Sequence, residues 1–224
     1  MAVWPARGHY IAAHPGHDRY IALAGLRRPP PPPETEPSTP SAPASRFTTE
    51  EPGKPDVGAV RLHVLEAGKV ALPDGRLAIS DAFINDHPLV VPDLARGEHS
   101  VEILVAQSQD DERIAAARVR LGTEAIASWR LVGVFAVDSG NGAFFDPAIA
   151  PQRMIQQFNE RLLTALEASA RPTYSIASIQ WEGRTFVAFS TGFGDGRYPV
   201  FLGSSSVGAP MIVLVDSEIL PWPN

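Results

Sequence analysis

Apolar and polar residues alternate along much of the chain after residue 57, which is typical of half-buried β-strands. In the first half, this pattern predicts strands over residues 60–65, 70–72, 76–79, 99–105, 113–121 and 129–137. In the second half, runs of β-branched and aromatic residues predict strands over 174–181, 185–190, 198–202 and 211–215. The alanines within 113–121 are also compatible with a helix there. No pattern of crossovers for a parallel sheet appears, and the turn residues Pro73-Asp74-Gly75 favour an antiparallel meander in the first half.

One amphipathic helix interrupts the strands. Its apolar positions recur at helical spacing, at Met154, Ile155, Phe158, Leu162, Leu163 and Leu166. The pair Asp146-Pro147 has the chemistry of a helix cap and first position, and the pattern ends near 169–172. The sequence therefore predicts an α+β fold that is predominantly antiparallel β and sandwich-like, with one main amphipathic helix.

The composition divides the chain at residue 56. Twelve of the 22 prolines lie in residues 1–56, including the run from Pro29 to Pro33. A segment so rich in Pro, Ser, Thr and Glu buries too little apolar surface to offset its ordering entropy. We therefore expect residues 1–56 to be a disordered Pro-rich extension and residues 57–224 to be a single β-rich globular domain.

The net charge of the chain limits the kinds of molecule that it is expected to bind. The net charge is −6, and residues 57–224 carry thirteen basic and nineteen acidic side chains. Such a surface repels a phosphate backbone, so no nucleic-acid partner is expected. No apolar run approaches the roughly 18 residues of a membrane span, and the chain has no cysteine. These features predict a soluble cytoplasmic protein with no membrane partner.

Two glycine-rich segments are candidates for a binding site. The segment Gly192–Pro199, with the sequence GFGDGRYP, lies between two predicted strands and is expected to connect neighbouring strands tightly. The segment 138–146, with the sequence DSGNGAFFD, lies between a buried strand and the helix. A ligand- or partner-binding face is predicted from six residues: Asp138, Ser139, Asn141, Asp195, Arg197 and Tyr198. Here Arg197 would pair with an anionic ligand and Tyr198 would provide an aromatic anchor.

The aspartates of these segments also allow a metal site. Carboxylates and loop carbonyls are the ligands of Ca²⁺ and Mg²⁺, so Asp138, Asp146 and Asp195 could hold a divalent cation, with Asp216 completing the set. The structural alternative is that Asp146 caps the helix, Asp138 and Asp195 stabilise turns, and Asp216 ends a strand. Dinucleotide-binding and serine-hydrolase patterns fail, because a strand follows the glycines and no histidine has a recognisable acid partner.

Together, the two segments resemble a bacterial family catalogued as domain of unknown function 4241. The resemblance extends over roughly residues 62–216 and includes the turn 73–75, Asp81, Arg113, Trp129 and Asp216. Ser217 follows Asp216 here, whereas an aromatic residue is common at that place in the family. The resemblance implies a domain boundary and no particular mechanism.

The sequence supports two hypotheses for the function. The first is a small binding module, with the segments 138–146 and 192–199 contacting a protein or small ligand, for example as an immunity protein for a toxin. The alternative is a metal-assisted hydrolase, in which the aspartates hold a cation that activates water. No residue is assigned a catalytic role, so whether the protein is an enzyme stays open at this point.

Overall fold

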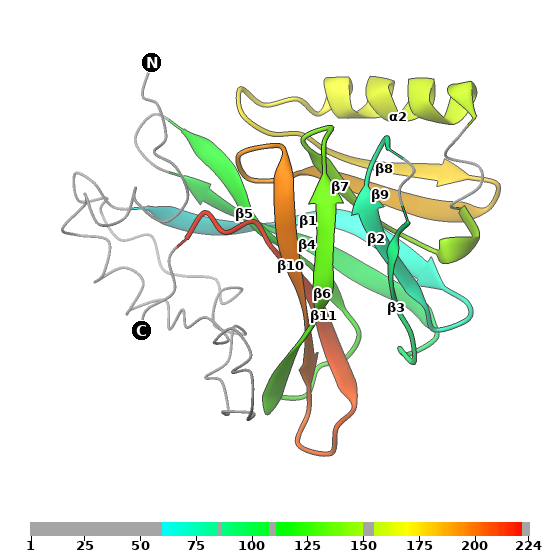
Figure 1. Ribbon diagram of the computed structural model, residues 1–224, viewed down its shortest axis with the longest axis vertical. Coiled ribbons are helices and arrows are strands. Elements are labelled where there is room, and N and C mark those ends of the chain that lie inside the picture. Colours follow the sequence, from blue (N-terminus) through cyan, green and yellow to red (C-terminus); the bar gives the residue numbers. More distant parts are fainter. Residues whose placement is uncertain (1–59, 85–86, 108–110, 150–154, 221–224) are drawn as a thin grey trace.

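The fold consists mainly of two packed antiparallel sheets. The computed structural model describes residues 60–84, 87–107, 111–149 and 155–220. Within these residues, eleven strands form one sheet of six and one of five, with one α-helix (Figure 1). This confirms the predicted, mostly antiparallel, sandwich-like fold. The predicted disordered extension, residues 1–56, and Met154 of the helical pattern lie outside the described residues.

The strand order explains how the chain moves between the sheets. The six-stranded sheet comprises β1 (Arg61–Leu72), β4 (Gly97–Gln107), β5 (Glu112–Arg120), β11 (Pro210–Asp216), β10 (Gly196–Ser204) and β6 (Ser128–Val137), in that order. The five-stranded sheet comprises β3 (Leu89–Val91), β2 (Leu77–Asp81), β7 (Asn141–Phe145), β9 (Arg184–Ser190) and β8 (Ile176–Trp181), in that order. Residues 113–121 thus lie mainly in a strand, β5.

Two predicted connections are wrong, for the same physical reason. The turn Pro73–Gly75 joins β1 and β2, but β1 pairs with β4 and β2 pairs with β3 and β7. The first half is therefore no meander. The glycine-rich segment after β9 also does not join neighbouring strands, because β9 and β10 lie in different sheets. Both segments carry the chain from one sheet to the other. A turn needs the same residues whether or not the strands on its two sides pair with each other.

Both faces of the six-stranded sheet are apolar. Ile103, Val200 and Val213 belong to the cluster between the two sheets. Their sequence neighbours Leu104 and Phe201 belong to a second cluster on the opposite face, which is joined by residues after β11 such as Ile219. Because successive side chains of a strand point to opposite faces, a strand covered on both sides reads as a continuous apolar run.

The helix α2 (Gln156–Ala168) covers the outer face of the five-stranded sheet (Figure 1). Its buried side chains are Phe158, Leu162 and Leu166, and the Phe158 ring packs against Trp181 and Phe186, with centroids 5.4 and 5.1 Å away. The helix ends at Ala168, close to the predicted end. Among the described residues, no helix is long and apolar enough to cross a membrane.

The predicted start of the helix is wrong. Asp146 accepts a hydrogen bond from the backbone N–H of Ala148 at 3.0 Å and caps a short 3₁₀ turn over residues 147–149. The α-helix begins later, at Gln156, and its N-cap residue Ile155 makes no capping bond with its side chain. Ile155 and Leu163, both expected on the buried side, are 41% and 50% exposed.

Candidate functional site

The buried carboxylate of Asp81 organises the first of the two loops. Asp81 ends β2, and its oxygens accept hydrogen bonds from the backbone N–H groups of Phe83 (2.8 Å) and Ile84 (2.9 Å), just downstream. Across the fold, they also accept from the N–H groups of Asp138 and Ser139, both at 2.8 Å, and from the Ser139 hydroxyl at 2.7 Å. One side chain therefore fixes the backbone of the loop between β6 and β7.

This hydrogen bonding sets the charge state of Asp81. Burial raises the pKa of the carboxyl, because it removes water from the charged form. The hydrogen bonds from Ile84, Phe83 and Ser139 favour the charged form and together outweigh burial, so the pKa lies below its ordinary value of 3.8. Asp81 is therefore a carboxylate at neutral pH, although its residue is only 3% exposed.

The first loop is bonded to the second. The amide of Asn141 donates to the carbonyl oxygen of Ser139 at 2.9 Å, and its oxygen accepts from the Ser190 hydroxyl at 3.3 Å. The N–H of Thr191, the first residue after β9, donates to the carbonyl oxygen of Gly140 at 3.0 Å. Gly140 has a φ of +71°, a conformation that glycine adopts easily. The two glycine-rich segments therefore form one structural unit.

Tyr198 organises the second loop from inside. Its ring is 2% exposed and lies beside Phe135, with centroids 6.0 Å apart. Its hydroxyl donates to the carbonyl oxygens of Gly194, at 2.7 Å, and Thr191, at 3.1 Å. The loop is also held to β5, because the Arg113 guanidinium donates to the carbonyl oxygen of Gly192 at 3.4 Å.

Three side chains remain on the outside of this unit, and we call them the loop face: Asp138, Asp195 and Arg197. All three residues are exposed, and within the described part of the chain none of their side chains has a hydrogen bond or an ion pair. Gly196 is paired with Val137, so the residues beside this pair, Asp195 and Asp138, lie next to each other at the end of β10 and β6. The loop face therefore carries the carboxylates of two neighbouring residues and one guanidinium.

The structure thus divides the six residues predicted to bind a ligand or partner. Asp138, Asp195 and Arg197 point outward, as a binding face requires. Ser139 and Asn141 hold the loops through hydrogen bonds. The ring of Tyr198 lies in the core, so in this structure it supports the loop from within and presents no aromatic surface to a partner.

The three aspartates predicted to bind a metal are not gathered. Asp146 follows Phe145, the last residue of β7, and the four steps from Asn141 to Phe145 alone span about 14 Å. There its carboxylate accepts from the Arg184 guanidinium at 3.0 Å. Asp216 is buried and accepts from the N–H of Glu218 at 3.0 Å. Among the described residues, no three Asp, Glu, His or Cys side chains are grouped as a metal site would need.

Sequence reasoning missed the central role of Asp81. Of the bonds described above, all but the one from the Ser139 hydroxyl come from backbone N–H groups, and those groups leave no trace in a sequence. The available signal was an aspartate at the end of an alternating strand, followed far along the chain by the segment Asp138-Ser139-Gly140.

Fold and loops together define a two-sheet antiparallel sandwich with a helix on one face and two bonded glycine-rich crossover loops. The chain belongs to the family described as "Protein of unknown function (DUF4241)", which matches residues 70–215. The match includes both loops and confirms the resemblance seen in the sequence. Neither the curated proteins nor the solved structures include a match to this chain.

Proposed function

We propose that the protein is a binding module whose loop face contacts a protein partner. The observation that supports this is the contrast between the inside and the outside of the loops. Inside, Asp81 and Tyr198 hold the backbone through hydrogen bonds. Outside, the three charged side chains of the loop face have no partner within the described residues. A surface that is already ordered loses little backbone entropy when it binds.

The charges of the loop face indicate the chemistry of the partner. Asp138 and Asp195 directly follow and precede the paired residues Val137 and Gly196, so two negative charges stand at the same end of β6 and β10. A basic group on a partner would pair with these carboxylates, and the Arg197 guanidinium would donate to a carboxylate beside it. We therefore infer a partner with a mainly basic contact surface. If the partner is a toxin, the protein acts as an immunity protein.

The metal-assisted hydrolase gains no supporting observation. Its cation would need Asp138, Asp146 and Asp195 together, whereas Asp146 lies at the other end of β7 and pairs with Arg184. The binding module needs only Asp138 and Asp195, whose backbones are neighbours at the end of β6 and β10.

The test compares three forms of the full chain: the unchanged protein, the double variant Asp138→Lys/Asp195→Lys, and the control Asp74→Lys/Glu124→Lys. Both double variants change the net charge equally, and all four positions are exposed. We expect the unchanged protein and the control to retain the same protein from a cell extract, and the loop-face variant to lose it. With the purified partner, the loop-face variant should bind at least about tenfold more weakly. Equal binding by all three folded forms would contradict the proposal.

A further inference from the structure

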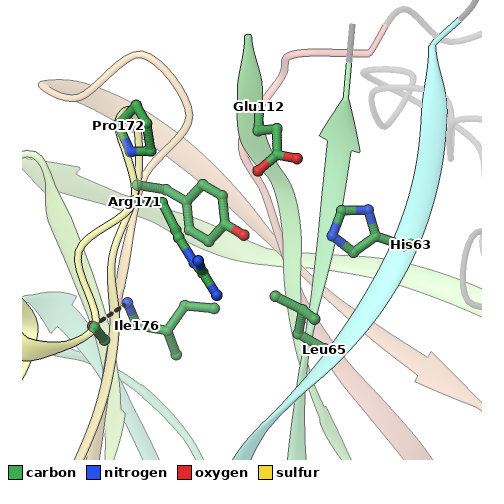
Figure 2. A pocket seen from close by; sticks show the side chains of 8 residues that line it. His63, Leu65, Glu112, Arg171, Pro172 and Ile176 are labelled. Atoms are coloured by element: carbon green, nitrogen blue, oxygen red, sulfur yellow. Dashed lines mark hydrogen bonds between the residues drawn. The ribbon is translucent and has the colours of Figure 1, made fainter.

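A pocket of about 660 Å³ opens at one side of the sandwich, and none of the loop-face residues lines it. It lies between β1, the start of β5 and the segment that joins α2 to β8 (Figure 2). Its lining comprises His63, Leu65, Glu112, Ser169, Arg171, Pro172, Tyr174 and Ile176. Its volume is in the range of sites that take small molecules.

The pocket forms where the edges of the two sheets part. β1 approaches β8 at Gly68, where an added Cβ would lie 3.1 Å from the Ser178 hydroxyl. The register of β1 with β4 shifts between Glu66 and Gly68, so β1 is irregular at this point. The part of β1 before the shift, with His63 and Leu65, faces the segment that precedes β8.

The walls of the pocket are held in place by hydrogen bonds. The Thr173 hydroxyl donates to the carbonyl oxygen of Glu112 and so ties the segment before β8 to β5. The Ser169 hydroxyl donates to the carbonyl oxygen of Leu166 at 3.0 Å and accepts from the N–H of Ile176 at 3.2 Å. The pocket is therefore built into the fold.

Two opposite charges face the pocket from different walls. Glu112 comes from β5 and Arg171 from the segment before β8, and the side chains of both point into the space that His63 also faces (Figure 2). Within the described residues, neither charged group has a hydrogen bond or ion pair. Both act on Tyr174: burial raises the pKa of its phenol, the Glu112 carboxylate raises it further, and the Arg171 guanidinium lowers it. The two charges therefore flank the same ring.

Apart from His63 and Ser169, the remaining lining is largely hydrocarbon. Leu65, Pro172 and Ile176 contribute hydrocarbon surface, and Tyr174, 8% exposed, adds its ring. A simple anion would satisfy Arg171 but would be repelled by Glu112. A molecule with one anionic group, one cationic group and an apolar part would pair with both charges and pack on the apolar side chains.

We propose that this pocket binds a small zwitterion of the α-amino-acid class with an apolar side chain. The ligand carboxylate pairs with Arg171, the ammonium group pairs with Glu112, and the side chain packs on Leu65 and Ile176. His63 lies across the pocket and contributes a hydrogen bond. This site is independent of the loop face, so the failure of one proposal leaves the other standing.

The first test uses ligand analogues and the full chain. L-Leucine and L-phenylalanine are titrated by calorimetry, beside N-acetyl-L-leucine, which lacks the ammonium charge, and L-leucinamide, which lacks the carboxylate. We expect saturable binding of at least one of the two amino acids at about one per chain, and at least about tenfold weaker binding of both leucine analogues. The absence of saturable binding for both amino acids would overturn the proposal. So would binding of inorganic phosphate that is tighter than theirs, which would indicate a site for simple anions.

The second test uses variants of the two charged side chains. Arg171→Gln should remove most of the preference for leucine over leucinamide, and Glu112→Gln most of the preference for leucine over N-acetyl-leucine. Arg161→Gln and Glu124→Gln, which are exposed and outside the lining, are the controls. All variants should unfold at nearly the temperature of the unchanged protein, because neither pocket charge has a bonded partner. Folded pocket variants that bind leucine as tightly as the controls would contradict the assignment.

Discussion

The hydroxyl of Ser139 donates a 2.7 Å hydrogen bond to the carboxylate of Asp81, 58 residues earlier in the chain. The backbone N–H of Ser139 donates to the other oxygen of the same carboxylate at 2.8 Å. This pair joins the end of β2 to the loop that leaves β6, and so connects the two sheets. The loop face depends on it, because Asp138 precedes Ser139 directly.

The first prediction concerns Asp81→Asn. Each carboxylate oxygen accepts from two backbone N–H groups. In either orientation of the asparagine amide, its NH₂ group therefore faces two donors and cannot accept from them. Buried donors without an acceptor cost about 1–3 kcal/mol each, so we expect the free energy of unfolding to fall by about 3 kcal/mol. Urea denaturation measures this. Asp74→Asn, in an exposed turn, is the control and should change stability by less than about 0.5 kcal/mol. Equal effects at the two positions would contradict the role of Asp81.

The second prediction concerns pH. The pKa of Asp81 is below 3.8 in the folded protein, so near and below pH 3.8 the unfolded chain binds more protons at this residue. The contribution of the carboxylate to stability is therefore present above its unfolded pKa and is lost as the pH falls through its folded pKa. The difference in stability between the unchanged protein and Asp81→Asn should shrink steadily from about pH 5 downwards. Urea titrations at several pH values between 7 and 3 measure this difference, and a constant difference would contradict the prediction.

The third prediction concerns Tyr198→Phe. The substitution keeps the buried ring but removes the hydroxyl that donates to Gly194 and Thr191. We expect a loss of about 1–2 kcal/mol in the free energy of unfolding, together with faster hydrogen exchange in residues 191–196. Tyr174→Phe is the matched control, because the Tyr174 hydroxyl has no hydrogen bond among the described residues. If both variants lost the same stability, the hydroxyl of Tyr198 would not be what holds the loop.

Most strands were predictable because their cause is local, but β3 and β7 were not predicted, and β7 lies within the glycine-rich segment 138–146. Alternating and continuous apolar runs record which faces are covered, and β10 and β11 follow that rule closely. Strand partners were not predictable in the same way. The turn Pro73–Gly75 has the same residues whether the next strand pairs beside β1 or passes to the other sheet.

The candidate sites were only partly predictable, because they join distant segments. The glycine-rich segments were visible in the sequence, and so were the charges of the loop face. The bond between Asp81 and Ser139 was invisible, as was the meeting of Glu112 with Arg171 at one pocket. Neither depends on a local pattern; both depend on the sheet order.

The start of α2 shows how local chemistry can mislead. Asp146-Pro147 has the residues of a helix cap, and it does cap a turn, over 147–149. The helix that follows begins instead after Ile155, whose side chain makes no cap bond. The apolar face located the helix correctly, because Phe158, Leu162 and Leu166 pack on the five-stranded sheet.

This uncapped start leads to the fourth prediction, on Ile155→Ser. Ile155 has the extended backbone of an N-cap residue (φ −82°, ψ 127°), so a serine hydroxyl there can accept from the backbone N–H of Gln157. The first turn also contains no acidic residue. Ile155 is 41% exposed, so part of its apolar burial is lost with the substitution and offsets part of the gain from the cap. We expect the free energy of unfolding to rise by at most about 0.5 kcal/mol.

Leu163→Ser is the matched control for this prediction. Leu163 is also largely exposed, at 50%, but it lies inside the helix, where serine has the lower helix propensity. That variant loses helix propensity and part of its apolar burial and should lose about 1 kcal/mol, so the same replacement residue has opposite effects at the two positions. Thermal and urea unfolding of both variants measure this. A loss of stability at both positions would mean that serine does not cap α2 at residue 155.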